Sequence, residues 1–141
     1  MLLKKSNGDS SLSTMIVSLL AIVVFFVMIV LQLDATTALS RRNEITHICD
    51  SYLELTMAKG WLTEEDEKAM LRELDGAGCN TIVVEGNLER NGNQAAYGEK
   101  IHLRVTYSLD LTTHTFTSLA ISGTGTNTVT SEYDRYTTCY K

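Results

Sequence analysis

Histidines and clustered carboxylates are the residues whose types could bind a metal or transfer protons. His47, His102 and His114 contain no pair with the i, i+4 spacing of a zinc-binding helix. A zinc site also needs three or four converging ligands, so ordinary polar placement is the favoured interpretation. Residues 64–67 (EEDE) lack the D-x-D-x-D-G order of a calcium loop and predict the acidic first turn of a helix instead. We therefore expect no cofactor, no metal and no enzymatic activity.

The three cysteines, Cys49, Cys79 and Cys139, are the other candidates. An odd number leaves at least one free thiol or one intermolecular bond. If the domain lies outside the cell, Cys79–Cys139 is the disulfide to test. It would close a loop of about 60 residues and contribute roughly 3 to 4 kcal/mol through loop entropy. Three buried thiols that act as small hydrophobic side chains are an equal alternative.

A long apolar segment must position these residues relative to a membrane. Met15 to Leu33 is a 19-residue run without charge, and 14 of its residues are Leu, Ile, Val or Phe. At 1.5 Å per residue it spans about 28 Å, close to a hydrocarbon core of about 30 Å. The run is longer than the apolar part of a signal peptide, which has about 7 to 15 residues. It predicts an uncleaved transmembrane helix after a short polar cytoplasmic lead, residues 1–14.

The distribution of charge bears on nucleic-acid binding and on the orientation in the membrane. The 12 Lys and Arg and 17 Asp and Glu residues give a net charge of −5. Without Lys4, Lys5 and Asp9 of the lead, the rest has 10 basic and 16 acidic residues, a net charge of −6. A phosphate-binding surface needs the opposite sign, so direct nucleic-acid binding is not expected. Lys4 and Lys5 favour a cytoplasmic N-terminus and an extracellular domain, although Arg41 and Arg42 follow the span.

The pattern after the span predicts a second, amphipathic part of the same helix. Residues 9–59 contain neither Gly nor Pro. The apolar stripe Ile45, Ile48, Tyr52 and Leu55 recurs at helical spacing, with Cys49 and Thr56 beside it. We expect one helix from Ser11 to Ala58, transmembrane over residues 15–33 and packed on a domain beyond them.

Residues 60–141 predict a small α+β domain. Thr63 is a candidate N-cap for a short helix, Thr63 to Asp75. Strands are expected at residues 81–85, 101–111, 114–122 and 128–136, with a polar loop at residues 87–98 and a turn at residues 123–127. The short connections favour an antiparallel meander of about four strands.

The order of these parts resembles the plan of type IV and Tad-type pilins and pseudopilins: a polar lead, a Gly, an apolar helix that becomes amphipathic, then a small sheet. The chain also resembles a family of small single-pass proteins encoded near mobile-element, conjugation or pilus genes of Gram-positive bacteria. The residues that support this second resemblance are Gly8-Asp9, Tyr52, the run Gly60 to Asp66 (GWLTEED), Leu71, Leu74, Gly78, Tyr97-Gly98-Glu99, Ile101 and Leu103.

The resemblance implies a pilin-like fold, processing after Gly8 and before Asp9, and assembly through the N-terminal helix. The implied partners are membrane lipid, copies of the same chain, other pilin-like subunits and an assembly platform. In pilins a Glu is the fifth residue after the cleavage site; here that residue is Ser13. The chain is thus compatible with two interpretations, a minor pseudopilin and an unprocessed pilin-like accessory protein. A membrane-anchored binding module that uses the loop at residues 87–98 and never assembles is the alternative from another class.

Overall fold

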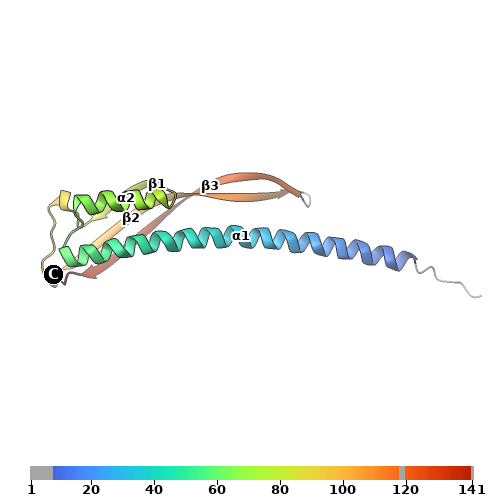
Figure 1. The fold of residues 1–141 in the computed structure, drawn as a ribbon, viewed down its shortest axis with the longest axis horizontal. Coiled ribbons are helices and arrows are strands. Elements are labelled where there is room, and N and C mark those ends of the chain that lie inside the picture. The colour runs from blue at the N-terminus through green and yellow to red at the C-terminus, as the bar shows by residue number, and fades with distance from the viewer. Residues whose placement is uncertain (1–7, 118–119, 141) are drawn as a thin grey trace, which may run out of the picture.

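The computed structural model describes residues 8–117 and 120–140 and has an α+β fold. Its elements are α1 (Gly8–Lys59), α2 (Glu64–Gly76), β1 (Cys79–Gly86), the 3-10 turn η1 (Glu89–Asn91), β2 (Lys100–Thr117) and β3 (Ala120–Thr138). Figure 1 shows α1 extending far beyond the sheet and α2. The predicted long helix, short helix and antiparallel sheet are confirmed.

The first helix is continuous from the apolar segment into the domain. It has 52 residues and starts at Gly8, three residues before the predicted start. It ends before Gly60, which has a positive φ of 84°. A Cβ on Gly60 would lie 2.4 Å from the carbonyl oxygen of Ala95, so only glycine fits this end of the helix.

The second helix begins as the sequence predicts. The hydroxyl of the N-cap residue Thr63 accepts a hydrogen bond from the backbone N–H of Asp66 at 3.2 Å. The four acidic residues 64–67 occupy the first turn, where the helix dipole favours negative charge.

Within the described residues, the sheet has three strands rather than four, in the order β1-β2-β3, all antiparallel. The predicted strand at residues 114–122 is divided between β2, which ends at Thr117, and β3, which begins at Ala120 and pairs with Thr117; residues 118–119 lie outside the described part of the chain. The predicted turn at residues 123–127 lies inside β3, where Gly123 and Gly125 pair with Thr115 and Thr113. Glycine costs only about 1 kcal/mol in a strand, and the surrounding threonines are β-branched and favour extended backbone.

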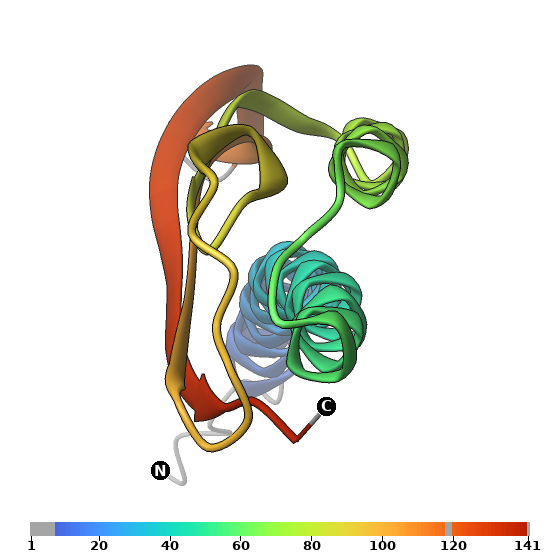
Figure 2. The same cartoon turned by 90° about the vertical axis from the view of Figure 1, so that its left-hand side faces the viewer.

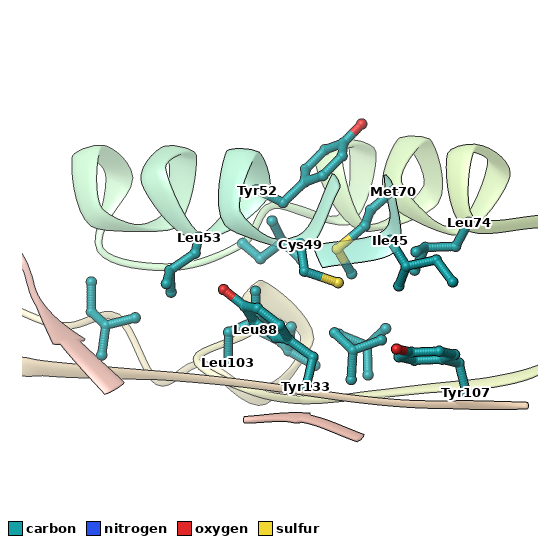
Figure 3. Close-up of a cluster of buried hydrophobic side chains, with 14 of the residues drawn as sticks. Ile45, Cys49, Tyr52, Leu53, Met70, Leu74, Leu88, Leu103, Tyr107 and Tyr133 are labelled. Carbon is teal, nitrogen blue, oxygen red and sulfur yellow. The ribbon is translucent and has the colours of Figure 1, made fainter. Parts of the chain in front are cut away.

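Both helices cover the same face of the sheet, and the core lies between them and that face (Figure 2). Alternate residues of β2 form the sheet side of the core, and Figure 3 shows Leu103 below Leu53 and Cys49, and Tyr107 below Ile45. On α1 the buried residues are Ile45, Cys49, Tyr52, Leu53 and Thr56. The predicted stripe therefore needs one correction: Leu53 is buried, whereas Leu55 is 40% exposed.

Candidate membrane-spanning and helix-packing surface

The N-terminal half of α1 presents apolar side chains that the rest of the chain leaves uncovered. We call residues 15–33 the apolar half of α1. None of the residues in its most apolar 18-residue window is buried, and Phe25 and Phe26 are 68% and 59% exposed. The other exposed large side chains of this half are Met15, Ile16, Val17, Leu19, Leu20, Ile22, Val24, Met28, Ile29, Leu31 and Leu33. A soluble protein rarely exposes an apolar patch of this size, so the surface fits lipid or another helix.

The backbone of this half satisfies its own hydrogen bonds. An α-helix pairs each interior N–H with a carbonyl four residues earlier, so the segment needs no water or partner strand. Just after the apolar half, the hydroxyls of Thr36 and Thr37 also find partners within the helix, since each donates to the carbonyl four residues before it, at 2.7 and 2.9 Å. The segment is thus chemically suited to hydrocarbon along its whole length.

Asp34 is the first charged residue after the apolar half, and it contacts the β2–β3 hairpin. Its carboxylate lies 2.9 Å from Nδ1 of His114 and also accepts a hydrogen bond from the backbone N–H of His114 at 3.4 Å. The hydrogen bond with the His114 ring lowers the pKa of Asp34 from its ordinary value. Sequence analysis missed this contact, because 80 residues separate the two partners.

The C-terminal half of α1 is fixed to the domain by polar contacts around the core. Tyr133 of β3 donates to Asp50 at 2.5 Å, and Tyr52 donates to Glu73 of α2 at 2.9 Å. Burial raises the pKa of Tyr52 to about 12, and the Glu73 hydrogen bond acts in the same direction. We call residues 45–57 the docked half of α1. Because one uninterrupted helix joins both halves, the domain has a fixed direction relative to the apolar half.

The corner after α1 adds another connection to the domain. Nζ of Lys59 lies 2.5 Å from the Asp66 carboxylate, which also accepts from the Thr63 hydroxyl at 2.6 Å. Backbone bonds from Leu62 to Asn87 and from Glu89 to Leu62 join this corner to the loop after β1.

The candidate processing residues lie at the other end of the molecule. Gly8 and Asp9 are the first two residues of α1. The remainder of the predicted lead, residues 1–7, lies outside the described part of the chain.

The structure holds no Cys79–Cys139 disulfide, which was one of two equal alternatives for the cysteines. All three are free and buried. Cys79 pairs with Leu109 at one end of the β1–β2 ladder, whereas Cys139 follows Thr138, the partner of Lys100 at the other end. Nine residues of β2 separate those levels, about 30 Å of strand, and a disulfide needs Cα atoms within about 7 Å. The alternative of three buried thiols describes this structure.

The histidines lie apart from one another. His102 stacks on Tyr136, with ring centroids 4.2 Å apart, and its Nε2 lies 2.9 Å from Asp134. Arg104 also approaches Asp134, at 3.3 Å, so these are cross-strand pairs on the open face of the sheet. Within residues 8–117 and 120–140, no group of three or more His, Cys, Asp or Glu side chains is placed to hold a metal ion.

Comparisons of this chain with protein-family models, with curated proteins and with solved structures find no match. Function is therefore inferred from the residues and the geometry described above.

Proposed function

We propose that this chain is a non-enzymatic, pilin-like single-pass membrane protein. It would act as a minor structural or assembly component of a surface filament, a secretion apparatus or a DNA-transfer apparatus. The observation that carries the proposal is the apolar half of α1, which is exposed along its length and continuous with the docked half. Lipid would cover it before assembly, and neighbouring helices would cover it afterwards.

The physical basis is that such a helix can move from lipid into a helical bundle at a low cost in free energy. Its backbone hydrogen bonds are internal, so transfer from lipid into a helical bundle breaks none of them. Its side chains are apolar in both surroundings, and packing rather than a hydrophobic driving force would stabilise the bundle. The partners would be copies of this chain, other pilin-like subunits and the platform that assembles them.

Orientation follows from charge. Lys4 and Lys5 would keep the short lead in the cytoplasm, and the acidic domain would lie outside the cell. A net charge of −6 beyond Met15 argues against direct binding of nucleic acid, even if the apparatus transfers DNA.

Disulfide crosslinking in cells tests assembly. Single cysteines would replace Val17, Leu20 or Val24 while the three native cysteines, all buried, are kept. Assembly predicts oxidant-induced dimers at some of these positions and none for the parent chain. The membrane fraction after carbonate extraction provides the control for insertion. Full insertion without any helix–helix crosslink would contradict assembly and leave a simple anchor.

A binding module that remains in the membrane is the second candidate, and the loop at residues 87–98 favours it. This loop is ordered by its own contacts, such as the bond from Asn87 Nδ2 to the carbonyl of Asn93 at 2.9 Å. Tyr97 is nevertheless 78% exposed. A Tyr97→Ser variant that loses cellular function but keeps every helix–helix crosslink would favour this candidate.

A further inference from the structure

The far end of the β2–β3 hairpin extends beyond the core. The pairing of β1 with β2 ends at Cys79 and Leu109, and Leu109 is the last buried residue among those of β2 whose burial the structure describes. Beyond it, β2 pairs only with β3 among the described strands. We call residues 111–117 and 120–131 the projecting hairpin. Figure 1 shows it running beside α1, well past β1 and α2.

Two contacts fix the direction of the projecting hairpin relative to α1. Tyr133 meets Asp50, and His114, whose partner in β3 is Thr124, meets Asp34. From Asp50 to Asp34 the helix covers about 24 Å, and from Tyr133 to Thr124 the strand covers about 30 Å. The hairpin and the helix therefore run nearly side by side toward the apolar half of α1.

This direction takes the hairpin past the end of the membrane span. The strand continues for three residues from His114 to Thr117, about 10 Å, which covers about 8 Å of α1 at the same inclination, or about five residues. That length reaches the level of Ile29, inside the apolar half. If residues 15–33 cross the bilayer, Thr117 and Ala120 lie deeper in the membrane than Leu33, the residue at which the apolar half ends.

The composition of the projecting hairpin matches that position. Residues 111–131 contain no Asp, Glu, Lys or Arg, although 21% of the whole chain is charged. Charge returns at both borders, with Asp110 before this stretch and Glu132 after it. Leu111, Phe116 and Ile121 are apolar, and most of the others are Thr, Ser or Gly. Such a segment enters a membrane surface without burying a charge.

We propose that the projecting hairpin is a second membrane contact, which enters the lipid headgroups and the outer edge of the hydrocarbon beside the span. It depends on the proposed function, because it assumes that the apolar half of α1 is in lipid. The headgroup layer on each side is about 5 to 7 Å thick, so the residues just before His114 lie among hydrated groups and those from His114 to Thr117 reach the outer edge of the hydrocarbon. The hairpin pairs its inner backbone groups, and Asp34 accepts the outward N–H of His114.

Lipid is favoured over a second copy because the contact is continuous with the span. The same rigid arrangement that puts α1 in the membrane also puts the hairpin there, without any further partner. The groove between them is lined by residues from both elements, among them Ala38, Arg41 and Leu111.

Fluorescence quenching of the full chain in phosphatidylcholine–phosphatidylglycerol vesicles tests the proposal. An environment-sensitive dye would be attached to Phe116→Cys on the hairpin, to Phe25→Cys in the span and to Tyr136→Cys on the exposed sheet face. The native thiols are buried, so the parent chain controls for background labelling. We expect lipid-attached nitroxides to quench the dyes at positions 25 and 116. We also expect iodide quenching at position 116 to be weaker than at 136 by about three-fold or more, because the dye leaves water.

The other outcomes overturn the proposal in distinguishable ways. Iodide quenching at 116 equal to that at 136, with lipid quenching at 25, removes the hairpin contact but keeps the span. Protection of 116 from both quenchers assigns the hairpin to a protein partner, such as a second copy. Absence of lipid quenching at 25 removes the span, and with it both this inference and the membrane part of the proposed function.

Discussion

A single tyrosine hydroxyl joins β3 to the docked half of α1. The Tyr133 ring is buried, and its hydroxyl donates to Asp50. Burial and this carboxylate both raise the pKa of Tyr133. Tyr133→Phe would leave the partly buried Asp50 carboxylate without this donor. We expect a loss of about 1 to 2 kcal/mol, which lowers Tm by roughly 5 to 10 °C.

The matched control is Tyr136→Phe on the same strand. Tyr136 is 68% exposed, and its ring stacking on His102 would survive the change. Its effect should stay within about 0.5 kcal/mol, as for most surface substitutions. Near-UV circular dichroism of the full chain in detergent measures both variants. Equal Tm values for the two would mean that the Asp50 contact does not hold the helix.

The Asp34–His114 contact should depend on pH in one direction. The folded pKa of Asp34 is lowered below its ordinary value of 3.8, mainly by the hydrogen bond with His114. A lowered pKa means that the contact stabilises the fold above the ordinary value and is lost as pH falls through the folded value. The backbone amide signal of His114, followed by NMR, should therefore show an acid transition with a midpoint below 3.8.

Asp34→Asn provides the control for this titration, because it removes the ionisable group and should abolish the acid transition. A midpoint at or above 3.8 in the parent chain would show that His114 does not hold the carboxylate.

The three thiols should react only in the unfolded chain. Burial is the main cause that raises the pKa of Cys49 to about 12 and that of Cys79 to about 11, so little thiolate exists near neutral pH. Intact mass after brief iodoacetamide treatment should show no adduct in the folded chain and three in denaturant. Tyr136→Cys should add one adduct in the folded state. A disulfide would lower the parent mass by two hydrogens and leave a single adduct in denaturant. That result would contradict three free thiols.

At the scale of the elements, the corner after α1 depends on a glycine. Gly60 and Gly98 both have positive φ, 84° and 81°, but only Gly60 lies against another backbone group. Gly98→Ala should cost about 1 to 2 kcal/mol through the left-handed conformation alone. Gly60→Ala should cost about 1 to 3 kcal/mol more, because its Cβ would overlap the Ala95 carbonyl oxygen. Thermal unfolding of both variants measures the difference, which reports on the contact between position 60 and the Ala95 carbonyl. Equal losses of stability would show that this contact does not matter.

At the scale of the whole molecule, the fate of the N-terminus separates the two pilin-like hypotheses. Cleavage between Gly8 and Asp9 would make Asp9 the first residue and leave α1 intact apart from its first residue. A minor pseudopilin should give a mature chain that starts at Asp9, and an unprocessed accessory protein should keep Met1. Intact mass and N-terminal sequencing of the protein from native membranes measure this. A Gly8→Leu variant that keeps the same shortened start would show that another protease makes the cut.

Local patterns predicted most of the fold. The span, the continuous helix and the Thr63 cap depend on residues close in sequence, where periodicity and capping chemistry act directly. The strand count failed at residues 114–127 because Thr and Gly are compatible with both a turn and a strand. Pairing with β2 decides between turn and strand here. That pairing joins residues far apart in the chain, so a local sequence pattern does not reveal it.

The sequence by itself determined that an apolar helix of bilayer length precedes a small acidic α+β domain, because hydrophobicity, helical period and charge are properties of residue types. Only the tertiary structure decided that Cys79 and Cys139 lie near opposite ends of the β1–β2 ladder, and that Asp34 meets His114. It also decided that a hairpin without Asp, Glu, Lys or Arg runs beside α1. Each of these depends on strand register and on the direction of packing against α1, which bring together residues far apart in the chain.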